Sequence, residues 1–217
     1  MSCTLCETRK PRRSCPGVRG EICAPCCGAE REVTVTCPFE CEYLQEARLH
    51  ERAPNLKEED IPNLDIEVTE AFLHQNDPLI SLSSRILLET AFAVPGAADR
   101  DVQEALESLV KTLRTLQSGL YYESRPNNPL AAAIHQGFQA RMTQAREQMA
   151  RQSGVHSIRD SSLLGVLAFL QRLALQYDNG RGRGRSFLQF LFSEFADHPD
   201  GGGGAPASGA GSPLILP

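Results

Sequence analysis

The chain lacks cysteine over most of its length, because all eight of its cysteines lie between Cys3 and Cys41 in a sequence of 217 residues. It also lacks a long apolar run: the longest mostly apolar stretch, residues 163–170, is too short to cross a bilayer. The amino terminus opens on Met1-Ser2-Cys3 without the apolar stretch of a secretory signal. These absences favour a cytoplasmic protein that does not enter a membrane and whose thiols stay reduced.

Signatures of catalysis are missing as well. The sequence contains no His-Glu-x-x-His, Gly-x-Ser-x-Gly or kinase-like pattern. A single histidine beside the apolar stripe of a helix, as His135 is beside Ile134, is usually packed or solvated rather than a catalytic base. The sequence therefore weighs against an enzyme, and we name no catalytic residue.

Charge limits the choice of partner. The composition is 41% hydrophobic and 23% charged, which is ordinary for a globular protein, and the formal net charge is −5. Two tetrathiolate zinc sites would add about −4, which gives a total near −9. Such a protein is a poor general binder of nucleic acid.

Composition divides the chain into four parts. Residues 1–53 are the cysteine-rich module, residues 54–63 an acidic, proline-bounded linker, residues 64–197 a helical bundle, and residues 198–217 a flexible tail rich in Gly, Ala, Ser and Pro. We expect a mostly α fold, in which a small N-terminal zinc-binding module with a short β element precedes a bundle of five or six helices.

Apolar residues recur at helical spacing in the bundle region. One helix is expected from Asp101, which forms a capping-box-like pair with Glu104. A second is expected from Asn128 with Pro129 in its first turn, and the two are expected to pack as an antiparallel pair. Residues 64–69 alternate strictly, and this stretch stays open between a strand and the start of the helical region.

Two further helices are expected towards the end of the bundle. The helix after Asp160 is apolar on nearly all sides over residues 163–175, so we expect it to be the most buried. A last aromatic helix covers residues 187–195, with Ser186 as its N-cap. Its aromatic stripe either completes the bundle or meets a second copy of the chain, and the sequence leaves the oligomeric state open.

The cysteine spacing is typical of zinc binding. It reads Cys3-x2-Cys6-x8-Cys15-x7-Cys23-x2-Cys26-Cys27-x9-Cys37-x3-Cys41. Zinc takes four soft ligands at about 2.3 Å in a tetrahedron, and a two-residue gap lets one tight turn offer two sulfurs to one ion. The sequence therefore predicts two Zn²⁺ ions, which all eight cysteines hold for structural reasons.

Local patterns suggest how the module is built. Residues 23–28 read as a zinc knuckle, with Gly28 at the positive φ of a tight turn, and residues 31–36 alternate like a strand. Cys37 and Cys41 open a helix that runs to about Arg52. This order resembles the treble-clef class of zinc modules over about residues 23–52. The resemblance implies two ligand sets, Cys23, Cys26, Cys37 and Cys41 for one ion and Cys3, Cys6, Cys15 and Cys27 for the other.

A rival pairing also fits the spacing. It joins Cys3 and Cys6 with Cys23 and Cys26, whose separation of 16 residues suits a zinc ribbon. The sequence does not choose between the two pairings. His50 follows Cys41 by nine positions, about 180° around a continuous helix, so we do not expect it to be a ligand.

Two basic segments are candidate anion sites. The patch from Arg9 to Arg13, with Arg19 nearby, has no aromatic platform beside it, and eight acidic residues balance eight basic ones in the first 53 positions. Residues 179–185 alternate Gly and Arg before a helix, yet match no phosphate-binding fingerprint. We read them as a mobile surface turn between helices.

The sequence thus supports three hypotheses of function. The first is a non-catalytic binding or adaptor protein whose partner is another protein. The second is a nucleic-acid-associated regulator that uses the patch from Arg9 to Arg19. The third is a thiol-redox sensor with a zinc–cysteine switch.

Overall fold

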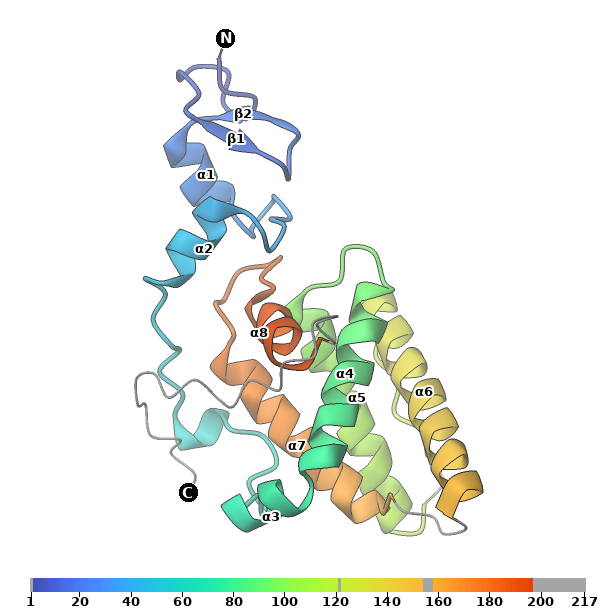
Figure 1. Cartoon of the computed structure of the whole chain (residues 1–217). Coiled ribbons are helices and arrows are strands. Elements are labelled where there is room, and N and C mark those ends of the chain that lie inside the picture. The colour runs from blue at the N-terminus through green and yellow to red at the C-terminus, as the bar shows by residue number, and fades with distance from the viewer. Residues whose placement is uncertain (1, 121, 154–157, 197–217) are drawn as a thin grey trace.

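The computed structural model describes residues 2–120, 122–153 and 158–196 of the chain, and the expected tail over residues 198–217 lies outside them. Over these described residues the fold is 57% helical, with eight helices and a small two-stranded antiparallel sheet near the N-terminus, as the sequence predicts. Residues 2–53, which we call the head, lie beyond one end of the helical bundle (Figure 1).

The head contains two strands and two short helices: β1 (Arg13–Cys15), β2 (Gly20–Ile22), α1 (Ala24–Glu30) and α2 (Glu42–Arg48). β1 and β2 pair antiparallel, with Arg13 opposite Ile22. This hairpin is not predicted from the sequence, where its only signal is the Pro16-Gly17 turn between two three-residue strands.

The strand expected over residues 31–36 is wrong. The carbonyl of Glu30 accepts hydrogen bonds from the backbone N–H groups of Val33, Thr34 and Val35, so the chain turns back on itself after α1. Gly28 lies inside α1 and is not among the positive-φ residues; Glu32, with φ of 53°, takes the left-handed conformation instead. The turn after α1 therefore depends on a charged residue rather than on glycine.

The second helix of the head is shorter than expected. Cys41 is the N-cap of α2, and its backbone N–H donates to the Pro38 carbonyl. Cys37 therefore lies in the turn before the helix rather than in its first turn. The helix ends at Arg48, four residues before the expected boundary at Arg52.

The region after the head holds six helices and one 3-10 turn. The 3-10 turn is η1 (Glu58–Asp60), and the helices are α3 (Glu70–Gln75), α4 (Asp77–Phe92), α5 (Asp99–Gln117), α6 (Pro129–Ser153), α7 (Asp160–Gln176) and α8 (Ser186–Phe195). The alternating residues 64–69 form turns and irregular structure, not a strand. Ile66 packs against the bundle core and Val68 is buried, whereas Leu64 in the same stretch is exposed.

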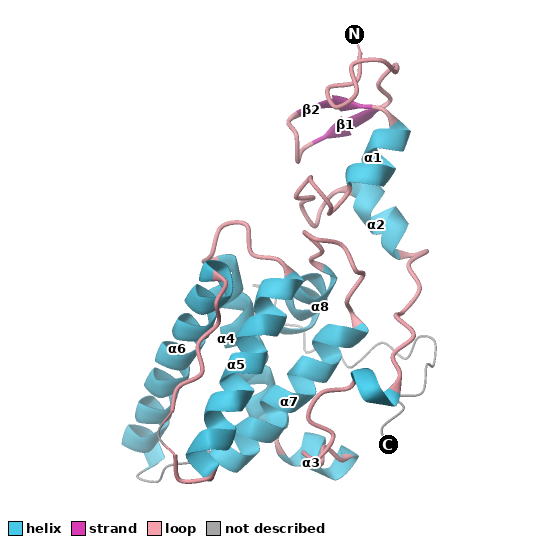
Figure 2. Ribbon diagram, turned by 180° about the vertical axis from the view of Figure 1, so that it is seen from behind, coloured by secondary structure: helices cyan, strands magenta, loops and turns pink. Residues whose placement is uncertain are grey.

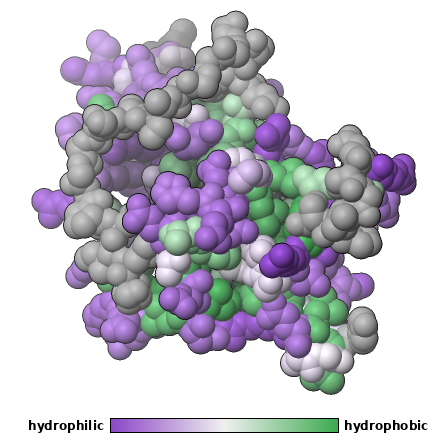
Figure 3. Space-filling model, turned by 60° about the horizontal axis from the view of Figure 1, so that its bottom comes forward, coloured by the Kyte–Doolittle hydropathy of each residue, from purple (hydrophilic) through white to green (hydrophobic). Residues whose placement is uncertain are grey.

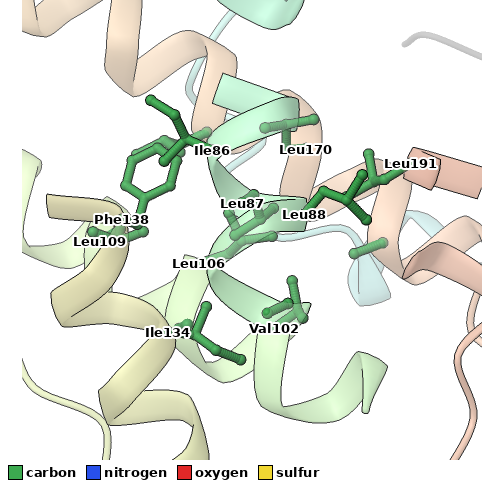
Figure 4. Close-up of a cluster of buried hydrophobic side chains, with 14 of the residues drawn as sticks. Ile86, Leu87, Leu88, Val102, Leu106, Leu109, Ile134, Phe138, Leu170 and Leu191 are labelled. Carbon is green, nitrogen blue, oxygen red and sulfur yellow. The ribbon is translucent and has the colours of Figure 1, made fainter. Parts of the chain in front are cut away.

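The core of the bundle forms where α4, α5, α6 and α7 meet. Every residue of α7 from 163 to 168 is buried, which agrees with its apolar surface on all sides. The aromatic ring of Phe138 and the side chain of Ile134 on α6 face Leu87 on α4 and Leu106 on α5 (Figure 4). Burial of apolar surface contributes about 25 cal/mol per Å² to stability, so this contact region is the main source of the bundle's stability.

The helices α5 and α6 run parallel, so the antiparallel pair expected from the sequence is wrong. The Glu104 carboxylate near the start of α5 accepts from the backbone N–H groups of Asn127 and Asn128, which directly precede α6. The connecting loop returns along the helices before α6 begins (Figure 2). Thr112 of α5 holds this loop through hydrogen bonds with Ser124.

Helix α8 is capped by a residue far away in the sequence. The buried carboxylate of Asp99 accepts from the backbone N–H groups of Phe187 at 2.9 Å and Leu188 at 3.0 Å. The N-cap position belongs to Arg185, and no side chain at that position caps the helix. The expected Ser186 cap is therefore wrong, since Asp99 supplies the acceptor.

The 179–185 loop packs against the head. The side chain of Asn179 donates to the Glu32 carboxylate at 2.9 Å, and the Arg181 guanidinium donates to the Arg31 carbonyl at 2.6 Å. The backbone N–H of Arg183 donates to the Glu32 carbonyl at 2.7 Å. Gly180, Gly182 and Arg183 are exposed, as expected of a surface turn, and the same loop attaches to the head.

Three phenylalanines meet where the head contacts the bundle. Phe39 of the head lies 5.9 Å, centroid to centroid, from both Phe92 at the end of α4 and Phe192 of α8. Phe92 and Phe192 are also 5.9 Å apart, and the Arg185 guanidinium lies 4.4 Å from the centroid of the Phe39 ring. We call these three rings the aromatic junction.

The outer surface is mixed in character. On the face shown in Figure 3, hydrophilic side chains surround smaller apolar areas. Within the part of the chain that the structure describes, no helix combines the length and the apolar character needed to span a membrane.

Candidate metal centre

Four cysteines of the head form a compact cluster. The sulfurs of Cys3, Cys6, Cys23 and Cys26 all lie within 4.8 Å of one another. Four sulfurs at about 2.3 Å from a tetrahedral zinc ion would be about 3.8 Å apart. The cluster therefore has the dimensions of a tetrathiolate metal site.

The first two sulfurs come from a tight turn at the start of the chain. The Cys3 N–H donates to the Arg9 carbonyl and the Glu7 N–H to the Cys3 carbonyl, both at 2.8 Å. Glu7 has a φ of 55°, so the chain reverses directly after Cys6. The Thr4 N–H donates to the carbonyl of Glu21 at 2.9 Å, which fixes this turn against β2.

The other two sulfurs come from the start of α1. Cys23 is the N-cap, and Pro25 stands in the first turn, where its missing N–H costs no helical hydrogen bond. The Cys23 N–H donates to the Cys3 sulfur at 3.2 Å, and the sulfurs of Cys6 and Cys23 are 4.0 Å apart. Two turns, one at each end of the hairpin, thus present their sulfurs to a common centre.

The pKa values of three cysteines in the cluster are shifted in different directions. Hydrogen bonds from the Thr8 side chain and from the backbone N–H groups of Thr8 and Arg9 lower the pKa of Cys6 to about 5. Burial opposes ionisation of Cys3, but backbone N–H groups led by that of Cys23 outweigh it and lower its pKa. Hydrogen bonding to Cys23, then burial, raise the pKa of Cys26 to about 12. A bound divalent cation would stabilise the thiolate form of Cys26 and so offset its raised pKa.

Arginines from the basic patch contact cysteine sulfurs of the head. A hydrogen bond to Cys23 is the main reason that the pKa of Arg9 lies above its usual value. The Arg13 guanidinium donates to the Cys27 sulfur at 3.3 Å and lies 4.4 Å from the centroid of the Tyr43 ring. Two of the patch's cations therefore compensate sulfur charge within the head.

The structure brings together the zinc-ribbon set rather than the treble-clef set. Cys37 and Cys41 lie outside the cluster of four, so the ligand set implied by the treble-clef resemblance is not assembled. The physical reason is the hairpin, which returns the chain from the first turn to Cys23. His50 is exposed and follows the end of α2, outside the cluster.

The remaining sulfurs are less tightly grouped. Among the described residues, no three of Cys15, Cys27, Cys37 and Cys41 have sulfurs within 4.8 Å of one another. Burial, together with the neighbouring Cys41 and Cys15, raises the pKa of the Cys37 thiol.

His135, the histidine singled out in the sequence, is packed in the bundle. It is 2% exposed, and its Nε2 atom has no hydrogen-bond partner in the structure. Burial lowers its pKa, so the neutral imidazole is favoured. This environment agrees with a packed histidine rather than a catalytic base.

No known family model, curated protein or solved structure matches the chain. The site itself defines the class of protein, which is a helical protein with a cysteine-rich head able to hold a metal ion in a four-cysteine cluster.

Proposed function

We propose that the chain is a non-catalytic zinc protein in which Cys3, Cys6, Cys23 and Cys26 hold one Zn²⁺ ion for structural reasons. The observation that carries the proposal is the convergence of four thiols from two turns within 4.8 Å. Four protein sulfurs complete the tetrahedral shell and leave no position open for a substrate.

The composition of the head supports the structural role. Its buried core contains five cysteines, and only three other apolar side chains are fully buried there, namely Ile22, Val35 and Leu44. Such a core is too small to fold a fifty-residue module by burial alone. Metal binding therefore supplies folding free energy, as in other small zinc modules.

Removal of metal tests the proposal. A strong zinc chelator added to the full-length protein should collapse the NMR dispersion of head residues such as Ile22, while the bundle keeps its helical circular dichroism. Replacing Cys3 and Cys6 together with serine should have the same effect without a chelator. A head that keeps its native dispersion after its metal is removed would refute the proposal.

The partner we propose is another protein. The aromatic junction supports this role, because Phe92 is 42% and Phe192 38% exposed beside Arg185. Aromatic and arginine side chains dominate the binding energy of protein interfaces. The same junction joins the head to the bundle, so a partner that binds there contacts both parts.

Surface variants test the adaptor role. Phe192→Ser should abolish the binding of proteins that the chain captures from a lysate of its source. Leu116→Ser is the control, because Leu116 is equally exposed but lies at the distant end of α5, and this variant should retain those proteins. If both variants keep every bound protein, the aromatic junction is not the docking surface.

A thiol-redox sensor is the second candidate. Cys6 and Cys26 are partly exposed, whereas Cys3 and Cys23 are buried, so an oxidant would reach the first pair before the second. Zinc release under mild peroxide, before the bundle unfolds, would favour this role. Loss of zinc only upon unfolding would exclude it.

A further inference from the structure

The four cysteines outside the first cluster surround one small pocket in the half of the head nearer the bundle. Cys15, Cys27, Cys37 and Cys41 all line this pocket. They come from the end of β1, from α1, from the turn before α2 and from the N-cap of α2. Cys15, Cys27 and Cys37 are less than 10% exposed, so the sulfurs face inward.

Positive charge is concentrated on one of these sulfurs. The Arg13 guanidinium donates to the Cys27 sulfur at 3.3 Å, and that of Arg31 at 3.6 Å. Two guanidinium donors beside one sulfur would stabilise the negative charge that a metal-bound sulfur carries, since each hydrogen bond is stronger when the acceptor is charged. A cysteine that only fills a core would need neither arginine.

Adjacent positions on α1 direct their side chains to different centres. Cys26 belongs to the first cluster and borders the pocket as well, whereas Cys27 lines the pocket and lies outside the first cluster. Successive residues on a helix point about 100° apart, so the two side chains leave α1 in different directions. The helix therefore divides the eight cysteines into two sets of four.

We infer that Cys15, Cys27, Cys37 and Cys41 form a second structural zinc site, interleaved in sequence with the first. The four sulfurs are farther apart than in the first cluster, so binding requires the turn that carries Cys37 and Cys41 to close on Cys15 and Cys27. The ligand class is a soft divalent cation in a closed tetrathiolate site. This inference goes beyond the first centre and does not depend on it.

Native mass spectrometry of the full-length, zinc-loaded protein tests the second site. The wild type should carry two ions. Replacing Cys37 and Cys41 together with serine should leave one ion. One ion in the wild type that persists when Cys37 and Cys41 are replaced would overturn the second site and leave the first intact. No ion in any of the proteins would overturn both.

Alkylation of the native wild type gives a test that needs no variant. Two occupied sites should protect all eight cysteines from iodoacetamide until a chelator is added. Modification of Cys41 in the zinc-loaded protein, while Cys3 and Cys6 stay protected, would overturn the second site. A Cys41→His variant keeps a zinc ligand at that position and should still carry two ions, whereas its failure to bind the second ion would contradict the assigned role of Cys41.

Discussion

The Glu32 carboxylate in the head accepts a hydrogen bond from the side chain of Asn179, 147 positions later in the sequence, at 2.9 Å. It also accepts from the Arg48 guanidinium at 2.8 Å and from the backbone N–H of Arg185 at 3.1 Å. Glu32 is fully buried, so its charge depends on these donors. One carboxylate thus joins the head to the 179–185 loop.

We expect Glu32→Gln to loosen the head from the bundle. Neutralising one partner of a buried ion pair costs about 3 kcal/mol, because Arg48 then keeps only the more distant carboxylate of Glu51, 3.8 Å away. Chemical denaturation should show this loss, and amide exchange should rise in residues 179–185. The exposed Glu21→Gln is the control and should leave both measurements unchanged. Equal effects from the two variants would show that Glu32 is no junction residue.

The second prediction concerns pH. Burial raises the pKa of Asp99 to about 7 from an ordinary value of 3.8. Between these two values the unfolded chain has released its proton while the folded protein retains it. The free energy of unfolding should therefore fall as pH rises from about 4 to 7, by up to about 1.4 kcal/mol per pH unit.

The Asp99→Asn variant isolates this contribution. Asparagine does not titrate, so the difference in unfolding free energy between wild type and variant should shrink or reverse with rising pH and become constant above about pH 8. Protonation of the thiols in the head changes the unfolding free energy of both proteins equally, so comparing the two at each pH removes that contribution. Parallel pH profiles for wild type and variant would contradict the buried-acid assignment.

Gly17 gives a prediction about the second zinc site. A Cβ atom at this position would lie 2.8 Å from the Thr36 carbonyl oxygen and 2.6 Å from a methyl carbon of Val35. Gly17→Ala should push the hairpin away from the turn before Cys37 and weaken the second ion while sparing the first. Zinc transfer to a chromogenic chelator would report this as early release of one ion per chain.

Gly28→Ala is the matched control for Gly17→Ala. A Cβ atom at Gly28 would meet no atom within 4 Å, and the position is helical. Alanine there should keep both ions and stabilise α1 by up to about 1 kcal/mol. Early zinc release from the control as well would point to a general sensitivity of the head rather than to the hairpin contact.

The basic patch provides a fourth prediction. Arg13 contacts a cysteine sulfur, whereas its neighbour Arg12 is exposed. Arg13→Gln should weaken zinc binding by about 2 kcal/mol, roughly 30-fold, through loss of a charge-assisted hydrogen bond. Arg12→Gln should leave zinc affinity unchanged. Salt-sensitive retention on nucleic acid that both variants reduce equally would instead support the nucleic-acid hypothesis.

Local chemistry made part of this structure predictable. The cysteine cluster and the expected helices starting near Asp101, Asn128 and Asp160 follow from spacing and from apolar periodicity, which act over one or two turns. The observed α5 begins at Asp99, two residues before the expected start. Boundaries depend on capping atoms, which periodicity does not report.

Relations between distant residues were not predictable in the same way. The Asp99 cap on α8 and the contact of Glu32 with Asn179 each join positions far apart in the chain. The parallel direction of α5 and α6 depends on a loop that runs back along the helices, whereas short connections favour antiparallel neighbours. The choice between the two cysteine pairings likewise depended on the β1–β2 hairpin, which has only three residues in each strand.

Phe39 stands in the sequence between Cys37 and Cys41, and its ring packs against Phe92 and Phe192 of the bundle. The segment that would close around the second ion is therefore the same segment that covers two aromatic rings of the helical region. Binding of the second zinc ion in the head is therefore thermodynamically linked to the solvent exposure of the Phe92 and Phe192 rings in the bundle. A partner that contacts Phe92 and Phe192 would therefore change the zinc affinity of the head, and zinc would by reciprocity change the affinity for that partner by the same factor.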